Sequence, residues 1–282
     1  MRIANLNGRL ALIDGDHMSV DVETASAGRF TADPQAVYSR WTEFREWAAK
    51  AERGTGTAFQ AEDLGSPAPA PRQVFAIGLN YRTHASESGF SVPDTLPPVF
   101  TKYISAITGP VSTVQLPEGG NTDWEIELVV VIGKAAHHVA EADAWSHVAG
   151  LTAGQDLSER ISQMQSPVPQ FGFGKSFPGF APMGPYLVTP DEFENPDDLK
   201  LGCAIDGEEV QKGRTGDLIF PVSTLIAKLS AVVQLLPGDI IFTGTPAGVG
   251  MGRNPQRFLR PGELLVSHVE GIGELRQTFV EA

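Results

Sequence analysis

The clearest hydrophobic pattern of the chain lies in residues 123–133, which read Asp-Trp-Glu-Ile-Glu-Leu-Val-Val-Val-Ile-Gly. β-Branched residues dominate this segment and a glycine ends it, which is typical of a β-strand. Because strand side chains alternate between two faces, Glu125 and Glu127 share a face with Val129 and Val131. Both faces become apolar directly after the acids. The pattern predicts a strand buried on both sides, with two carboxylates about 7 Å apart at its start.

Two ionised carboxylates at an apolar edge repel each other, so this pair needs compensation. Protonation, a basic side chain or a cation would provide it, and a hard divalent ion such as magnesium suits carboxylate oxygens. The simpler alternative is a solvent-facing pair, since acidic side chains are mostly exposed. Glu125 and Glu127 alone favour that alternative, and the other segments shift the balance toward the cation.

Residues 1–64 predict a small N-terminal domain. A β-hairpin or meander occupies residues 1–22, with a turn at Asp14-Gly15-Asp16. Asp33-Pro34 has the pattern of a helix start, and Arg53-Gly54 that of its end. Between them, apolar residues repeat at helical spacing at Val37, Trp41, Phe44, Ala48 and Ala51.

Residues 65–72 alternate proline with small residues, which predicts a stiff connector. We therefore divide the chain into a small domain at 1–64, a linker at 65–72 and a large domain at 73–282.

The large domain begins with an apolar strand at 73–77 that runs into residues 78–89. His84 and Glu87 are three residues apart there, so one helical turn places them side by side. A carboxylate beside an imidazole orients it and makes it a better base, which is the arrangement of a group that activates water. A surface ion pair on a frayed turn is an equally good interpretation of these two residues alone.

Asp156 follows a predicted strand at 151–153, and strand ends commonly carry functional side chains. If residues 157–163 are helical, Asp156 caps that helix, which is also the purely structural interpretation. Such a helix places Arg160 and Gln163 on the same side as Asp156.

Two glycine-containing loops are further candidates for the site. Lys175 lies in Gly174-Lys175-Ser176, but a phosphate loop needs glycine where Pro169 stands. Lys175 is then either a lysine that reaches into a pocket or a plain surface lysine. The loop 243–250, after a predicted strand at 239–242, allows backbone to approach a ligand closely but lacks the dinucleotide pattern.

Shorter patterns predict the remaining elements. They are a helix at 141–148, a hairpin turning at Asp206-Gly207, a helix from 222 to 236 ended by Pro237-Gly238, and strands at 264–266 and 275–279. His137-His138 is predicted to be a surface feature, because adjacent strand residues point apart.

Composition and charge exclude several classes of protein. The 282 residues carry a net charge of −13, which argues against a nucleic-acid or anionic-membrane surface. The single cysteine, Cys203, cannot form an internal disulfide, so we expect a cytoplasmic protein. The first residues lack the apolar run of a signal peptide, and no apolar stretch approaches the ~18 residues of a membrane span.

Taken together, the segments after the connector resemble the fumarylacetoacetate hydrolase superfamily. Each motif alone is weak, but their joint order and spacing are specific. The five motifs are Gly78-Leu79-Asn80-Tyr81-x-x-His84-x-x-Glu87, Glu125-x-Glu127, Asp156-x-x-x-Arg160-x-x-Gln163, Gly174-Lys175-Ser176-Phe177 and Gly244-Thr245-Pro246-x-Gly248-Val249-Gly250.

The resemblance implies an α+β, β-rich fold, in which a mixed β-sandwich roll carries a small N-terminal α+β domain, and it implies a homodimer. The eukaryotic fumarylacetoacetate enzyme has a fourth acidic metal ligand where this chain has Ile77. The chain therefore resembles the bacterial branch of acylpyruvases and 2-hydroxyhepta-2,4-diene-1,7-dioate isomerases, and fumarylacetoacetate itself becomes a doubtful substrate.

Residue roles follow from the same resemblance. Three carboxylates match the ligands of a magnesium or manganese ion, two residues match the pair that activates water, and four match groups that hold the substrate and its developing enolate. In that order they are Glu125, Glu127 and Asp156; His84 and Glu87; and Lys175, Arg160, Gln163 and Thr245.

The expected function is metal-dependent hydrolysis of a carbon–carbon bond in a 2,4-dioxo acid, a small-molecule substrate. Two other reactions could use the same residues: decarboxylation of a β-oxo acid such as oxaloacetate, and isomerisation or hydration of a 2-hydroxydienoate. A non-catalytic metal-dependent binding protein is the alternative from a different class, although such a protein needs no water-activating pair.

Overall fold

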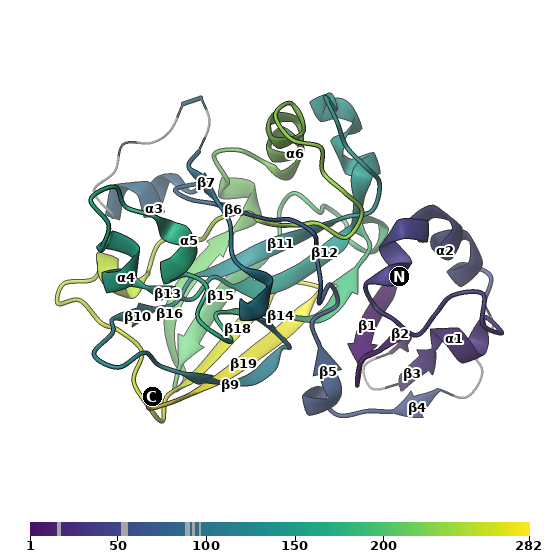
Figure 1. Cartoon of the computed structure of the whole chain (residues 1–282), viewed down its shortest axis with the longest axis horizontal. Coiled ribbons are helices and arrows are strands. Elements are labelled where there is room, and N and C mark those ends of the chain that lie inside the picture. The colour runs from purple at the N-terminus through teal and green to yellow at the C-terminus, as the bar shows by residue number, and fades with distance from the viewer. Residues whose placement is uncertain (16–17, 52–55, 88–90, 92–93, 96) are drawn as a thin grey trace.

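The computed structural model describes residues 1–15, 18–51, 56–87, 91, 94–95 and 97–282. Two β-sheets form its centre, and short helices lie around them (Figure 1). The N-terminal strands and helices gather at one end of the molecule, and helices α3, α4 and α5 lie at the other end.

The larger sheet runs the length of the molecule. In spatial order its main path is β4 (Thr57–Ala58), β3 (Met18–Asp21), β2 (Arg9–Asp14), β1 (Arg2–Leu6), β14 (Ala181–Val188), β12 (Val148–Gln155), β11 (Ile126–Ile132), β17 (Ile240–Phe242), β6 (Val74–Ile77) and β7 (Val99–Phe100). In addition, β5 (Leu64–Gly65) pairs with β1 and β8 (Ile107–Thr108) pairs with β14. The strands β11 and β12 are buried along their whole length, as expected for the centre of a layered fold.

The smaller sheet packs against β11 and β12. Its order is β16 (Glu208–Arg214), β15 (Lys200–Ile205), β18 (Leu264–Val269), β19 (Gly273–Val280) and β9 (Val111–Gln115). β10 (Thr122–Asp123) and β13 (Ser158–Glu159) form a separate two-stranded antiparallel ribbon. One continuous apolar core fills the space between the layers, so the predicted α+β, β-rich sandwich fold is confirmed.

The helices are short. The α-helices are α1 (Val22–Ala25), α2 (Trp41–Ala48), α3 (Arg82–Glu87), α4 (Arg160–Met164), α5 (Phe171–Gly174) and α6 (Val222–Ser230). The 3₁₀ turns are η1 (Ala36–Arg40), η2 (Ala61–Asp63), η3 (Ile104–Ala106), η4 (Glu141–His147), η5 (Pro190–Glu192), η6 (Thr215–Asp217) and η7 (Gly250–Gly252). Among the helices described, none combines the length and apolar character that crossing a bilayer requires.

Three predicted helices differ from the structure. Asp33 accepts a hydrogen bond from the Gln35 backbone in a turn, and the helix begins only at η1. The segment predicted as a helix at 141–148 is the 3₁₀ turn η4. The helix predicted to reach residue 236 ends at Ser230, because Leu235 forms a β-bridge with Ala136, which requires extended backbone.

The predicted hairpin turn at Asp206-Gly207 is confirmed. The hairpin of β15 and β16 turns at Asp206-Gly207, and both residues adopt the positive φ that such a tight turn requires. Asp16, Arg53 and Gly54, to which a predicted turn and a predicted helix end were assigned, lie outside the described residues. His137 and His138 are both exposed, as predicted.

The N-terminal segment continues the large sheet, because β1 pairs with β14. In the proline-rich stretch, Ala68 is fully buried in the main core and the Pro67 carbonyl accepts a 2.8 Å hydrogen bond from the Tyr38 hydroxyl. The boundaries at 1–64, 65–72 and 73–282 stay predictions. Because the connector makes these specific contacts, we expect it to contribute to the free energy of unfolding.

Replacing Tyr38 by phenylalanine should lower the free energy of unfolding by about 1–2 kcal/mol, because the Pro67 carbonyl loses its buried donor. Urea denaturation monitored by tryptophan fluorescence measures the change. The half-exposed Tyr103 provides the matched control, since its change to phenylalanine should cost less than about 0.5 kcal/mol. Equal losses in both variants would contradict a specific anchor at the connector.

Candidate active site

The central acidic strand is interrupted at Trp124-Glu125, between β10 and β11. Two buried glutamines take over backbone hydrogen bonding there. The Gln155 side-chain oxygen accepts from the Glu125 N–H at 2.9 Å, and the Gln211 oxygen accepts from the Ile126 N–H at 3.0 Å. The predicted single strand at 123–133 is therefore wrong in its continuity. Glu125 is therefore held by a side chain from another strand, Gln155 of β12, where regular strand pairing is interrupted.

Glu125, Glu127 and Asp156 meet as predicted. Each offers an oxygen that lies within 4.8 Å of the others, and all three residues are buried. Asp156 does not cap a helix: α4 begins at Arg160, and the Glu159 side chain caps it by accepting from the N–H groups of Ile161 and Ser162. The capping prediction was wrong, and the Asp156 carboxylate is engaged in the acidic cluster instead.

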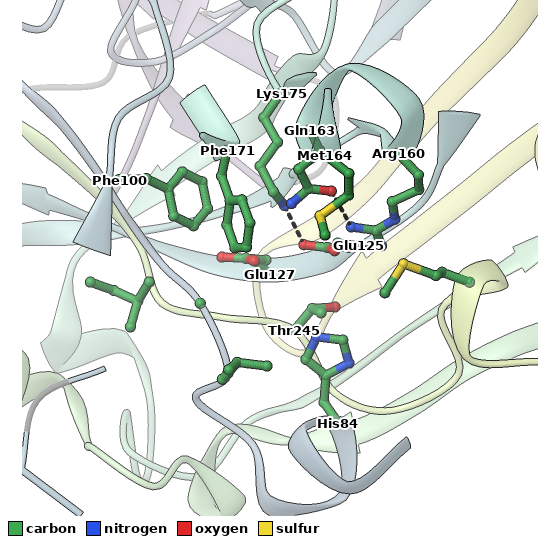
Figure 2. Close-up of a pocket in the computed structure, with 14 residues that line it drawn as sticks. His84, Phe100, Glu125, Glu127, Arg160, Gln163, Met164, Phe171, Lys175 and Thr245 are labelled. Carbon is green, nitrogen blue, oxygen red and sulfur yellow. Dashed lines mark hydrogen bonds and ion pairs between the residues drawn. The ribbon is translucent and has the colours of Figure 1, made fainter. Parts of the chain in front are cut away.

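Two predicted cations lie against these acids. The Lys175 Nζ donates to Glu125 at 2.7 Å and to Asp156 at 2.6 Å, from the end of α5. The Arg160 Nη2 donates to Glu125 at 2.7 Å, and Nη1 donates to the Gln163 oxygen at 3.1 Å. Figure 2 shows Lys175, Arg160 and Gln163 gathered on one side of Glu125. Lys175 is buried, so its interpretation as a plain surface lysine is wrong.

Two further charged residues were missed by the sequence analysis. Asp123 accepts two hydrogen bonds from Arg160 and one each from the N–H groups of Gly250 and Met251. Lys102 donates to Asp156 at 2.6 Å and also to the Lys175 carbonyl. The available signal was one lysine directly after the apolar run 97–101, a position that suits a buried partner better than a solvated one.

The His84–Glu87 pair forms as predicted on α3. The His84 Nδ1 lies 2.9 Å from the Glu87 Oε1, and the Gly248 N–H donates to both Glu87 oxygens at 3.1 and 2.9 Å. With Nδ1 engaged, Nε2 is the ring nitrogen available to a bound molecule. His84 approaches Glu125 and Glu127 from the side opposite Lys175 (Figure 2).

Thr245 lies close to His84 and Glu125, but its hydroxyl already makes two hydrogen bonds within the protein. It donates to the Ile126 carbonyl at 2.8 Å and accepts from the Gln211 side-chain nitrogen at 2.8 Å. These contacts hold the loop 243–250 to β11. The contact with a substrate carboxylate that the resemblance implies stays a prediction.

A cavity of about 270 Å³ lies among these side chains. Its charged and titratable lining residues are His84, Glu125, Glu127, Arg160 and Lys175. Its apolar lining includes Ile77, Leu79, Phe100, Met164, Phe171 and Met251. The cavity thus offers both charged groups for a polar part of a ligand and apolar surface for a hydrocarbon part.

The charges in this site do not balance. Burial alone would raise the pKa of the Glu125 carboxyl, but the Lys175 and Arg160 charges outweigh burial and bring this pKa down to about 2. Burial, together with the Asp156 and Glu125 carboxylates, raises the pKa of Glu127 well above its usual value. Glu127 accepts a 2.7 Å bond from the Gly244 N–H, and within the described part of the chain no cation is bonded to it.

This donor set fits a hard divalent cation. The carboxylates of Glu125, Glu127 and Asp156 supply oxygens close enough to share one ion, and oxygen ligands are those that magnesium and manganese prefer. A divalent charge would also compensate the ionised form of Glu127, which the described cations leave uncompensated.

The fold and the motifs define a member of one enzyme family. A model of the fumarylacetoacetate (FAA) hydrolase C-terminal domain matches residues 73–280, so the chain belongs to this family. Human oxaloacetate tautomerase FAHD2A is 43% identical over 209 residues, which cover 74% of this chain and 66% of that protein. The 2,4-didehydro-3-deoxy-L-rhamnonate hydrolase of a Sphingomonas species is 42% identical over 219 residues, covering 77% of this chain and 76% of that enzyme.

Solved structures agree along the whole chain. An HpcE-like protein of Mycobacterium smegmatis is 56% identical with a TM-score of 0.96, and all of both chains is covered. The maleylpyruvate hydrolase of a Sphingobium species, solved with manganese(II) and pyruvate, is 28% identical with a TM-score of 0.79, again over all of both chains. Family members thus include hydrolases and a tautomerase.

The raised pKa of Glu127 predicts a pH effect in chelator-treated protein. A carboxyl with a raised folded-state pKa contributes stability that is fully present below its unfolded pKa, near 4.5, and lost as pH rises through the folded value. Relative to Glu127→Gln, the wild type should therefore lose unfolding free energy between pH 5 and pH 8. Urea titrations at both pH values measure this difference, and a pH-independent difference would contradict it.

Proposed function

We propose that this protein is a divalent-metal-dependent hydrolase that cleaves a carbon–carbon bond in a 2,4-dioxo acid of the acylpyruvate type. The products are a pyruvate-type enolate and a carboxylic acid. The observation that carries the proposal is the oriented His84–Glu87 pair, which lies across the cavity from the acidic cluster and Lys175. A protein that only binds metal or oxo acids has no need of such a pair.

Glu125, Glu127 and Asp156 are the proposed ligands of magnesium or manganese. Such an ion, when bound, acts as a Lewis acid that polarises an oxo group and stabilises negative charge on an enolate oxygen. Support comes from the 4.8 Å grouping of the three carboxylates and from the manganese in the maleylpyruvate hydrolase structure.

His84 is the proposed general base. Its Nε2 takes a proton from water, while Glu87 holds Nδ1–H and stabilises the imidazolium that results. The hydroxide attacks the carbonyl carbon 4, and the bond between carbons 3 and 4 then breaks with its electrons passing into the enolate. The His84 imidazolium returns its proton to carbon 3, which completes the pyruvate and regenerates the base. General base catalysis of this kind contributes roughly 10²–10⁴ in rate.

Lys175 and Arg160 are the proposed electrostatic partners of the substrate. Both are fixed by ion pairs with Glu125, so their positions are set before a substrate binds. Each keeps an N–H beyond those used in the described bonds, and Gln163 offers its amide nitrogen beside Arg160. Fixed donors of this kind stabilise an enolate oxygen without reorganising when charge develops.

The apolar lining of the cavity favours an uncharged acyl group. Among the described lining residues, Arg160 and Lys175 are the only lysine or arginine side chains, and both are already paired with acids. Residues 83–101, which include the segment after α3, contain no lysine or arginine. A second substrate carboxylate would therefore either compete for Arg160 and Lys175, which are already paired, or lie against Phe171 or Met251 without a cation, which is unfavourable.

Proton transfer at carbon 3 is the second candidate, as tautomerisation of oxaloacetate or isomerisation of a 2-hydroxydienoate. The 43% identity to human oxaloacetate tautomerase favours it, and His84 could carry the proton. Decarboxylation of oxaloacetate would give the same enolate without water. Among the described lining residues the two cations, Arg160 and Lys175, are both paired with acids, and we therefore rank these dicarboxylic substrates behind acylpyruvates. We also propose a homodimer as the working assembly.

Acetylpyruvate, longer acylpyruvates and oxaloacetate, each with manganese or with a chelator, test the proposal. Pyruvate release from acetylpyruvate should be lost with chelator and should fall about 10²–10⁴-fold in His84→Ala. Lactate dehydrogenase coupling measures pyruvate, and loss of ultraviolet absorbance at constant pyruvate measures tautomerisation. The exposed His137→Ala is the matched control and should keep full activity. Turnover of oxaloacetate alone would overturn the hydrolase assignment.

A further inference from the structure

One buried lysine has no part in the chemistry proposed above. Lys102 follows β7, is 1% exposed and does not line the cavity. Burying an ammonium group is unfavourable unless ion pairs and hydrogen bonds compensate it. The position of Lys102 therefore requires partners that repay this cost.

The partners of Lys102 are both parts of the proposed site. Its Nζ donates to the Asp156 Oδ1 at 2.6 Å and to the backbone carbonyl of Lys175. The Nζ also lies 5.9 Å from the centre of the Phe242 ring, at the end of β17. Lys102 thus connects the end of β12, which carries Asp156, with the end of α5, which carries Lys175.

These contacts close a ring of hydrogen bonds. The Lys102 ammonium donates to the Asp156 Oδ1, and the Lys175 ammonium donates to the Asp156 Oδ2. The Lys175 backbone carbonyl accepts a second hydrogen bond from Lys102, which closes the ring. The Asp156 carboxylate is held at both oxygens and cannot rotate freely. The Lys175 backbone is held by Lys102 beside Asp156, which limits the positions that the Lys175 ammonium can adopt. The ring therefore sets the orientation of Asp156 and Lys175 together.

We propose that Lys102 is a positioning residue: it orients the Asp156 carboxylate toward Glu125 and Glu127 and holds the end of α5 so that Lys175 reaches Glu125. The inference rests on the proposed metal site. Lys102 influences metal binding through two opposing effects. The positive charge of Lys102 repels a nearby cation, whereas its hydrogen bonds preorganise a ligand, and preorganisation is the larger effect in this proposal.

Manganese(II) binding, measured by the loss of the free-ion EPR signal, separates the two effects without any substrate. Lys102→Met should bind manganese roughly 10–100-fold more weakly, the usual loss when a group that orients a metal ligand is removed. Lys102→Arg keeps the charge and the donors, so it should recover most of that affinity. With acetylpyruvate at saturating manganese, the loss in kcat for Lys102→Met should exceed the change in KM.

Asp239→Asn is the matched control for buried polar residues. Asp239 is fully buried and accepts hydrogen bonds from Gln73 and from the Leu236 N–H, away from the acidic cluster. Its substitution should lower the melting temperature and leave manganese affinity unchanged. If Lys102→Met does not fold, Lys102→Gln, which keeps one donor group, should still show weakened manganese binding that arginine restores.

Three outcomes would overturn the proposal. Wild-type manganese affinity in Lys102→Met, with only a lower melting temperature, would make Lys102 purely structural. Tighter binding would show that its charge merely opposes the ion. Failure of arginine to restore affinity would exclude the hydrogen-bonded ring as the cause. The proposed function fails separately, when the wild type itself binds no manganese or releases no pyruvate.

Discussion

An excess of buried negative charge is the constraint on which this structure depends. Asp123, Glu125, Glu127 and Asp156 are buried, Glu125 and Glu127 line one cavity, and the described cations bonded to these acids are Arg160, Lys175 and Lys102. Isolated buried charges cost several kcal/mol each, so every pairing in this cluster matters for folding. The pairings leave Glu127 without a bonded cation among the described residues, so its charge is removed by a proton or compensated by a metal ion.

The fold meets this constraint with long-range contacts and little local structure. Glu125 lies where the strand is interrupted, and the side-chain amides of Gln155 and Gln211 replace the missing backbone partners from two other strands. The buried side chain of Gln211 also ties the loop after β17 to the acidic strand through Thr245. The site is thus supported by strands of both sheets, β12 and β16, while His84 enters on the short helix α3.

Sequence patterns predicted those parts of the site that depend on local spacing. The alternation of faces brought Glu125 and Glu127 together, and helical spacing brought His84 to Glu87. Local rules failed where a distant partner decided the outcome. Asp156 has the sequence of a helix cap, but two lysines from other segments hold its carboxylate, and Glu159 is the cap. The partners of Lys102, likewise, lie 54 and 73 positions further along the chain, beyond the reach of any periodicity.

The arrangement also explains how one family can include hydrolases and a tautomerase. In the proposed function, the charged groups around Glu125, Lys175 and Arg160 would serve any reaction that develops negative charge on a 2-oxo acid, because an enolate is common to hydrolysis, decarboxylation and proton transfer. What distinguishes these reactions is the group on carbon 4 and whether water stands beside it. We propose that this group contacts the apolar lining of the cavity, which includes Phe171 and Met251, and that this lining determines the substrate.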